Sequence, residues 1–469
     1  MMRKNLSWIL AISGISVLGL AVYAYSPSRE KDRDYAMVRL LVDVLHEVRG
    51  RYVKPLDPEK ERQLVEDMIN GGLERLDPYS SYINPEEYKQ FNSTNKGRYG
   101  GIGVQVSRDP RTNLLQVISP MVGTPAYEAG IIAGDYIVKI EGKPTENIPV
   151  NDAVNLIQGE PDTTITLSIL HEGDKSPVDL TIKRAVISLP AVLGDTRLPG
   201  GKGWEYMVDK ESKIGYIRIT TFSETASKEM RQTMDTLMAQ GMRGLVLDLR
   251  NNPGGLLRSA VEIADMFIST GKIVSTRGRG QTEESFEAKG DGTIFLPAEQ
   301  HPIAVLINRS SASASEILAS ALQDSGRAVI IGERSFGKGS VQNVIEMENR
   351  QSALKLTTAS YWRPSGKNIH RFPDSKETDE WGVKPTEGYE VKMAPEEFRD
   401  YFLWRADRDV IRDGQKPKTE VRTEAKKDNP NPRTPPKDFK DKVMQKALET
   451  IRSKLKGESA GLLPDLGNA

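Results

Sequence analysis

Apolar residues follow three different patterns along the chain, and each pattern predicts a different kind of structure. In residues 36–96, most clearly up to residue 73, they recur every three or four positions, as on one face of a helix. In residues 97–185, short apolar alternations are interrupted by glycine and proline, which predicts strands joined by turns. In residues 186–410, apolar runs alternate with helical spacing, as in a buried sheet covered by helices. We therefore expect a multi-domain α/β protein.

The first 26 residues carry an export pattern. Arg3 and Lys4 precede an uncharged apolar stretch from Ser7 to Tyr25, and small residues around Ala24 offer a cleavage site. The stretch is also long enough for a membrane anchor. A buried core helix is the ordinary alternative, but it would stand alone beside a basic flank. We expect residues 1–26 to be a signal peptide or an inner-membrane anchor, and the remainder to be exported to the periplasm or cell envelope.

The other end of the chain, residues 411–469, is charged and rich in proline. Within it, Phe439, Val443, Ala447 and Ile451 recur at helical spacing. We expect a charged tail with a terminal helix between Asp438 and Leu455, and the pattern leaves open whether that helix docks on another part of the chain.

Composition excludes several kinds of chemistry. The 469 residues include 65 basic and 65 acidic side chains, so charge gives no argument for nucleic-acid binding. Cysteine is absent, which excludes disulfides, thiol catalysis and thiolate metal sites. The four histidines do not stand in an obvious Ser-His-Asp order. We expect neither a metal nor a cofactor.

One stretch, residues 308–342, combines a serine cluster with a lysine between two glycines. An apolar strand, Ile303–Ile307, leads into it, and a helix with Glu316 in its first turn begins within the cluster. A second apolar strand, Ala328–Gly332, precedes the lysine segment Gly337-Lys338-Gly339. The serines are Ser310, Ser311, Ser313 and Ser315. This order of elements can bring a nucleophile and a base together from distant positions.

A serine hydroxyl becomes a good nucleophile only when a neighbouring base takes its proton. Lys338 can be that base if burial lowers its pKa, and Ser-Lys pairs are an established variant of the catalytic triad. Gln342 is placed to hydrogen-bond the lysine and orient it. Spacing alone does not choose among the serines, because capping a helix is the ordinary role of each one. Most lysines, likewise, are solvated surface residues.

A glycine pair, Gly254-Gly255, follows the apolar strand Gly244–Arg250. Such a turn leaves backbone N–H groups free at the sheet edge where ligands bind, and beside a nucleophile they would form an oxyanion hole. The local sequence by itself favours the alternative of a plain loop between a strand and a helix.

Residues 97–185 resemble a PDZ domain. The loop Gly101-Ile102-Gly103-Val104 enters a strand rather than a helix, so a phosphate-binding loop is not expected. Free N–H groups beside an exposed strand edge suit the terminal carboxylate of a peptide. The turns Ala129-Gly130-Ile131 and Gly134-Asp135, followed by a helix over Val150–Gln158, complete the resemblance.

Residues 36–400 as a whole resemble the C-terminal processing peptidases, also called tail-specific proteases. The resemblance rests on segments in the family's order. They are Leu76–Ser80, the PDZ-like region, Asp248–Gly255, Ser311–Glu316 and Phe336–Gln342. It implies an N-terminal helical region, an inserted PDZ-like β domain and a crotonase-like α/β protease core.

The resemblance also implies roles for single residues. The family's nucleophile falls on Ser313, its general base on Lys338 and its lysine-orienting residue on Gln342. Its oxyanion donors fall on backbone N–H groups of Gly254, Gly255 and Ala314. The implied activity is that of a serine endopeptidase.

In the implied mechanism, the PDZ-like groove at Gly101–Val104 holds the C-terminal tail of an exported protein while an upstream bond reaches Ser313. The implied partners are such protein substrates, together with an adaptor protein or further copies of the chain. A trypsin-like protease would need a Gly-x-Ser-Gly-Gly segment, which is absent. A non-catalytic or latent PDZ scaffold is the remaining alternative.

Overall fold

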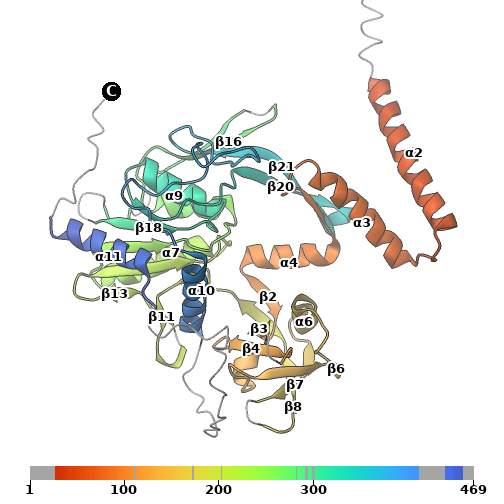
Figure 1. Cartoon of the computed structure of the whole chain (residues 1–469), viewed down its shortest axis with the longest axis horizontal. Coiled ribbons are helices and arrows are strands. Elements are labelled where there is room, and N and C mark those ends of the chain that lie inside the picture. Colours follow the sequence, from red (N-terminus) through yellow and green to blue (C-terminus); the bar gives the residue numbers. More distant parts are fainter. Residues whose placement is uncertain are drawn as a thin grey trace, which may run out of the picture. The chain divides into compact units, whose positions relative to one another are not determined.

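The structure, a computed structural model, separates into two compact units, residues 1–78 and 79–469 (Figure 1). It describes residues 27–109, 112–171, 174–201, 203–280, 282–290, 294–297, 301–410 and 439–457. The predicted export segment, residues 1–26, therefore lies outside the described residues, as do residues 411–438 and 458–469 of the predicted tail. None of the helices in the described ranges combines the length and apolar character needed to cross a bilayer.

In its described part, residues 27–78, the first unit consists of two helices, α2 (Pro27–Arg51) and α3 (Pro58–Glu74). Asp57 caps α3 by accepting a hydrogen bond from the Lys60 N–H at 2.8 Å. The break between the helices divides the predicted helical stretch of residues 36–73 in two. Several large apolar side chains of α2 are exposed. They include Tyr35, Met37, Val38, Leu40, Leu41 and Val42.

In the second unit, the PDZ-like region is a sheet of strand order β3-β4-β5-β7-β8, with β6 paired to β5. The elements are β3 (Val104–Arg108), β4 (Leu115–Pro120), α5 (Pro125–Glu128), β5 (Tyr136–Ile140), β6 (Lys143–Pro144), α6 (Val150–Ile157), β7 (Thr164–Leu170) and β8 (Val178–Lys183). The flanking strands β2 (Arg98–Gly101) and β9 (Ala185–Ser188) pair antiparallel, so the chain enters and leaves this region side by side. Its alternating apolar residues form a separate core.

A second sheet has the order β10-β14-β15-β18-β19, with β13 paired to β14. The strands are β10 (Val192–Leu193), β13 (Met207–Asp209), β14 (Ile214–Ile219), β15 (Gly244–Asp248), β18 (Ile303–Ile307) and β19 (Val329–Gly332). From β14 to β19 all neighbours are parallel. Their continuous apolar runs are buried on both faces, as the sequence predicted.

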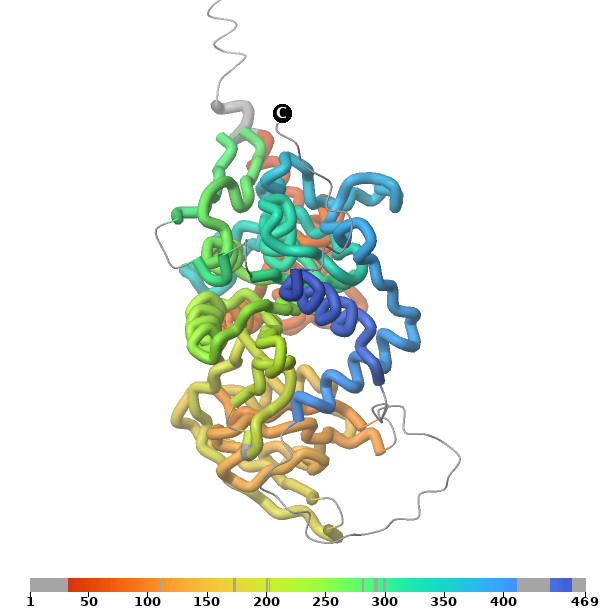
Figure 2. The backbone as a smooth tube through the Cα atoms, turned by 90° about the vertical axis from the view of Figure 1, so that its left-hand side faces the viewer, coloured from red at the N-terminus to blue at the C-terminus, as the bar shows by residue number. Residues whose placement is uncertain are grey.

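Helices cover both faces of this sheet. On one face, α7 (Ala226–Ala239), α8 (Leu257–Asp265) and α9 (Ala314–Asp324) pack against alternate strand residues such as Leu247 and Val305. On the other face, α11 (Lys442–Leu455) packs against the residues between them, such as Val246 and Leu306. The C-terminal helix, drawn in dark blue in Figure 2, therefore docks on the core. A further helix, α10, spans Pro395–Asp409.

Helix α7 begins later than its sequence pattern predicts. Apolar spacing over Phe222–Gln240 predicts a helix from Phe222, but α7 begins at Ala226. The reason is that the backbone of Phe222 is bound to the glycine loop: its N–H donates to Gly254 O at 3.0 Å, and its carbonyl accepts from the Leu256 N–H at 2.7 Å. These bonds hold the chain extended where the helix would otherwise start.

A third sheet carries the lysine segment. Its order is β1-β21-β16-β17, with β20 paired to β21. The strands are β1 (Ser81–Ile83), β16 (Lys272–Gly278), β17 (Glu284–Glu287), β20 (Ser340–Met347) and β21 (Ser352–Trp362). Because Lys338 lies two residues before the start of β20, this sheet sets where the lysine segment meets helix α9. The chain is thus a mixed helix and sheet protein with the helical, PDZ-like and α/β parts that the sequence predicted.

Candidate active site

Ser313 lies at a sharp turn between β18 and α9. Its backbone angles are φ 56° and ψ −116°, a sparsely populated combination for a residue with a side chain. A conformation of this kind costs about 1–3 kcal/mol and persists only where surrounding contacts impose it. A serine on a strained strand-to-helix turn is the geometry that exposes the nucleophilic hydroxyl in α/β-hydrolases.

Two of the neighbouring serines, Ser311 and Ser315, are occupied with structural hydrogen bonds. Ser311 is fully buried and its hydroxyl donates to Leu249 O at 2.8 Å. Ser315 is also buried and donates to Asn252 O at 3.0 Å. Ser313 is half-buried, and its hydroxyl has no hydrogen-bond partner among the residues that the structure describes. The geometry thus separates three serines that spacing alone did not.

Glu316 connects the serine turn to the lysine segment. Its side chain is fully buried, and its two oxygens accept four hydrogen bonds. Oε2 accepts from the N–H groups of Ser313 and Lys338, each at 2.8 Å. Oε1 accepts from Ser335 Oγ at 2.5 Å and from the Gly337 N–H at 2.7 Å. Burial raises the pKa of this carboxyl to about 7, although the four donors act in the opposite direction.

Lys338 is partly desolvated. Burial lowers the pKa of its ammonium, the positive charge of Lys355 lowers it further, and Glu316 opposes both. The Nζ atom lies 5.0 Å from the centre of the Tyr79 ring. Within the described residues, no hydrogen bond joins Nζ to Ser313 Oγ, although Glu316 Oε2 binds the backbone N–H groups of both residues.

Gln342 lies in β20, beyond the lysine. Its amide nitrogen donates to Ser340 Oγ at 2.8 Å and to Thr357 Oγ1 at 3.2 Å. In the part of the chain that the structure describes, it makes no hydrogen bond to Lys338. These contacts fix the side chain beside the lysine segment, and its role toward the lysine stays a prediction.

The glycine loop lies directly against the serine turn. A Cβ atom added at Gly254 would come within 2.8 Å of Ser313 Cβ and within 3.0 Å of Ala314 N. Gly254 has a φ of 107°, which is costly for any residue with a side chain. The fold therefore requires glycine here, and the glycine brings its backbone into contact with the serine.

The three predicted oxyanion residues differ in what their N–H groups do. The Gly254 N–H donates to Asn252 Oδ1 at 2.8 Å, so it is already used inside the loop. Neither the Gly255 nor the Ala314 N–H has an acceptor among the described residues. Two free donors beside a strained serine are suited to hold a developing negative charge.

The PDZ-like loop is separate from this centre. Gly101, Ile102, Gly103 and Val104 lead into β3, which is an edge strand of its sheet and lies beside α6. Gly103 has a φ of 77°, and a Cβ there would come within 2.4 Å of Thr124. An exposed strand edge next to a helix is the arrangement that accepts an added peptide strand.

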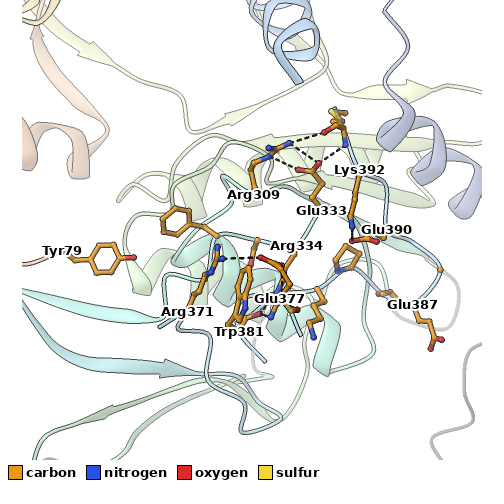
Figure 3. A pocket seen from close by; sticks show the side chains of 18 residues that line it. Tyr79, Arg309, Glu333, Arg334, Arg371, Glu377, Trp381, Glu387, Glu390 and Lys392 are labelled. Carbon is orange, nitrogen blue, oxygen red and sulfur yellow. Dashed lines mark hydrogen bonds and ion pairs between the residues drawn. The ribbon is translucent and has the colours of Figure 1, made fainter. Parts of the chain in front are cut away.

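A cavity of about 1030 Å³ lies beside the lysine segment (Figure 3). Phe336 and Gly337 contribute to its wall, whereas Ser313 and Lys338 do not. Most of its charged side chains form ion pairs, for example Arg371 with Glu377 at 3.3 Å. The Trp381 ring in its wall is buried, with the Arg334 and Arg371 guanidinium groups over it. No group of three or more potential metal ligands gathers within the described ranges.

Sequence reasoning missed the part played by Glu316, which it treated only as a capping residue. It also missed Asn308 and Asn251, whose side chains exchange hydrogen bonds: Asn308 Nδ2 donates to Asn251 Oδ1 at 2.9 Å, and Asn308 Oδ1 accepts from the Asn251 N–H at 3.0 Å. The one available signal was their position, since each follows a buried strand whose carboxyl end reaches the same sheet edge.

Comparison with known proteins finds matches over most of the chain. Residues 213–386 match the model of peptidase family S41, and residues 116–170 match a PDZ domain. The chain is 38% identical over 87% of its length to a carboxy-terminal-processing protease of Bartonella bacilliformis, of which 90% is covered. It is 38% identical over 69% of its length to one of Synechocystis, with 72% of that protein covered. A Bacillus subtilis carboxy-terminal processing protease is 36% identical over 69% of this chain and 65% of its own length.

The similarity to the Bartonella protein covers most of the chain, and the family match includes both the serine turn and the lysine segment. The chain therefore belongs to the carboxy-terminal-processing proteases, serine-type peptidases of family S41 that carry a PDZ domain.

Proposed function

We propose that the chain is a serine endopeptidase in which Ser313 is the nucleophile and Lys338 the general base. The observation that carries the proposal is the serine turn. Ser313 has a strained backbone and a hydroxyl without a partner among the described residues, and Glu316 binds its backbone N–H and that of Lys338 with one carboxylate oxygen. The desolvation of Lys338 supports its role, because a lowered pKa makes the neutral amine available.

In this mechanism, neutral Lys338 accepts the proton of the Ser313 hydroxyl as Oγ attacks the carbonyl carbon of the substrate. The negative charge that forms on the carbonyl oxygen is held by the N–H groups of Gly255 and Ala314, while Gly254 allows the loop to approach. The ammonium of Lys338 then gives its proton to the leaving amine, and water hydrolyses the acyl-enzyme. Gln342 orients the lysine. The chemistry requires no metal and no cofactor.

The PDZ-like region would select substrates by their C-terminal tails. The proposal is that the tail adds as a strand to the edge of β3, with its carboxylate at Gly101, Ile102, Gly103 and Val104. The edge position of β3 beside α6 supports this placement. A protein with an accessible, unfolded tail is the expected substrate class. Its export, and that of the enzyme, rests on the N-terminal sequence pattern alone.

The partner expectations stay predictions. An adaptor protein, a homo-oligomer and an attachment to the membrane were expected from the family resemblance and the N-terminal segment. The exposed apolar side chains of α2 are compatible with binding to an adaptor protein or to a second copy of the chain.

A latent enzyme is the second candidate, and one observation favours it. The Lys338 ammonium lies 5.0 Å from the centre of the Tyr79 ring and makes no hydrogen bond to Ser313 among the described residues, so in this reading the lysine rotates before catalysis. No observation favours a purely non-catalytic scaffold, because peptide binding alone would not require the strained backbone at Ser313.

The test is cleavage of an unfolded protein by the chain and by S313A, K338A and the matched control S310A, whose serine lies in the same turn. We expect S313A and K338A to be inactive with unchanged melting temperatures, and S310A to stay active. Full activity of S313A would refute the assignment. An inactive wild type that gains activity with a bound partner would favour the latent enzyme.

A further inference from the structure

Arg250 is buried between the glycine loop and the C-terminal segment of the chain. Its side chain is 2% exposed and forms ion pairs with two carboxylates. It donates to Asp248 through Nη2 at 2.6 Å, and to Asp441 through Nη1 at 2.9 Å and Nη2 at 2.8 Å. The guanidinium also stacks on the Tyr401 ring at 4.4 Å. Two carboxylates from distant parts of the sequence therefore fix one cation.

Asp441 belongs to the C-terminal helix. It is the N-cap of α11, and its Oδ1 accepts from the Met444 N–H at 3.0 Å. The helix buries Val443, Ala447 and Ile451 against the sheet face opposite α9 (Figures 1 and 2). Just before it, Phe439 packs on aromatic rings of α10, which lie 5.4 and 6.2 Å away. Asp441 is thus held in place by its own helix, independently of Arg250.

Arg250 is followed directly by the loop that touches the serine turn. The carbonyl of Asn252 accepts from the Ala312 N–H and from Ser315 Oγ, both at 3.0 Å. The Asn252 amide nitrogen donates to Ile219 O, and its Oδ1 accepts from the Gly254 N–H, each at 2.8 Å. A shift of the backbone at Arg250 would therefore reach the glycine loop within two residues, and through it the start of α9.

We propose that Asp441 is a positioning residue for the active site: the C-terminal helix supplies the carboxylate that holds Arg250, and Arg250 holds the glycine loop against Ser313. This inference deepens the proposed function and rests on it. It gives the far end of the chain a part in the reaction, although Asp441 touches neither substrate nor a reacting atom.

The energetics favour positioning over simple stabilisation. Buried ion pairs add little net stability compared with apolar packing, but the loss of one partner leaves the other charge uncompensated. Without Asp441, the Arg250 guanidinium keeps only one of its two ion pairs, the one with Asp248, and would rotate toward that residue. Because displacement of catalytic groups by about 1 Å can cost roughly a hundredfold in rate, we expect kcat to fall about tenfold or more.

The experiment uses the full chain and two variants, D441S and D441N. Serine and asparagine are both good N-caps, so α11 keeps its first turn in each. The serine side chain is too short to make the two hydrogen bonds that Asp441 accepts from Arg250. Asparagine removes the negative charge and replaces one of the two accepting oxygens by an NH₂ donor. The matched control is R452A, which removes a different ion pair of the same helix, Arg452 Nε to Asp209 Oδ2 at 2.7 Å. For each variant, kcat, KM and the melting temperature are measured with one unfolded substrate.

We expect D441S and D441N to lose about tenfold or more in kcat with KM within about twofold, and R452A to keep wild-type kcat. The inference is overturned if D441S keeps full kcat. It is also overturned if R452A loses as much kcat as the Asp441 variants for an equal fall in melting temperature, because docking of the helix would then explain both. An active S313A would instead refute the proposed function, whatever the Asp441 variants do.

Discussion

Replacing Glu316 with glutamine tests how the serine and lysine segments are held together. The substitution keeps the size of the side chain and exchanges one oxygen for an NH₂ group. The Ser335 hydroxyl can accept a hydrogen bond, so the amide is expected to place its nitrogen toward Ser335 and Gly337. The Gly337 N–H then has no acceptor, and Ser313 and Lys338 bond to a neutral oxygen rather than to a carboxylate.

One buried N–H group without an acceptor costs about 1–3 kcal/mol, and neutral hydrogen bonds are roughly half as strong as charged ones. The total loss is therefore about 2–4 kcal/mol. If half of it affects the transition state, kcat falls roughly tenfold, because about 1.4 kcal/mol corresponds to a factor of ten. The remainder lowers the melting temperature. The assay is kcat and KM on an unfolded substrate together with thermal unfolding, with S335A as a control that keeps the carboxylate.

The pH dependence gives an independent check. The folded pKa of Glu316, about 7, lies above the ordinary value of 4.5, so its contribution to stability is complete below about pH 4.5 and lost as the pH rises through 7. The free energy of unfolding of the wild type, relative to E316Q, should fall by about 3 kcal/mol over that range. Wild-type kcat and melting temperature in E316Q at every pH would refute the reasoning.

Three further substitutions test other parts of the account. K355A removes a charge that lowers the pKa of Lys338, so the alkaline rise in kcat/KM should move to higher pH; an unmoved profile would contradict the base assignment. G254A forces a Cβ to within 2.8 Å of Ser313 Cβ at a φ of 107°, and should cost about 1–3 kcal/mol of unfolding free energy and most of kcat; a fully active variant would contradict the loop geometry. G103A places a Cβ within 2.4 Å of a threonine and should weaken the binding of a C-terminal tail peptide, measured by fluorescence anisotropy. Short peptides that do not bind the PDZ-like region should still be cleaved. Unchanged binding of the tail peptide would argue against the β3 groove.

The elements that the sequence predicted well are those with a local cause. Strand β18 has the predicted bounds, because an uninterrupted apolar run can only be satisfied by burial on both faces. The sequence also indicates the serine and lysine segments, because the serines stand at a predicted helix start and the lysine stands between two glycines. Only the resemblance to a family, however, selected Ser313 from its neighbours.

What the sequence could not predict depends on contacts between distant residues. Ser311 and Ser315 are excluded as nucleophiles by carbonyl acceptors on the β15 loop, which no local pattern reveals. Glu316 has the sequence of an ordinary capping residue, and its bonds to Ser335, Gly337 and Lys338 exist only in the fold. The docking of α11 was left open for the same reason, since Asp441 and Arg250 stand 191 residues apart.

The most direct test of the central claim is to look for the acyl-enzyme. The chain is mixed with a peptide ester, quenched in acid after a short time, digested and analysed by mass spectrometry. The account predicts the acyl group on Ser313 in the wild type and no acylation in K338A, because the serine hydroxyl would then have no base. An acyl group on another residue, or equal acylation of Ser313 without Lys338, would contradict it.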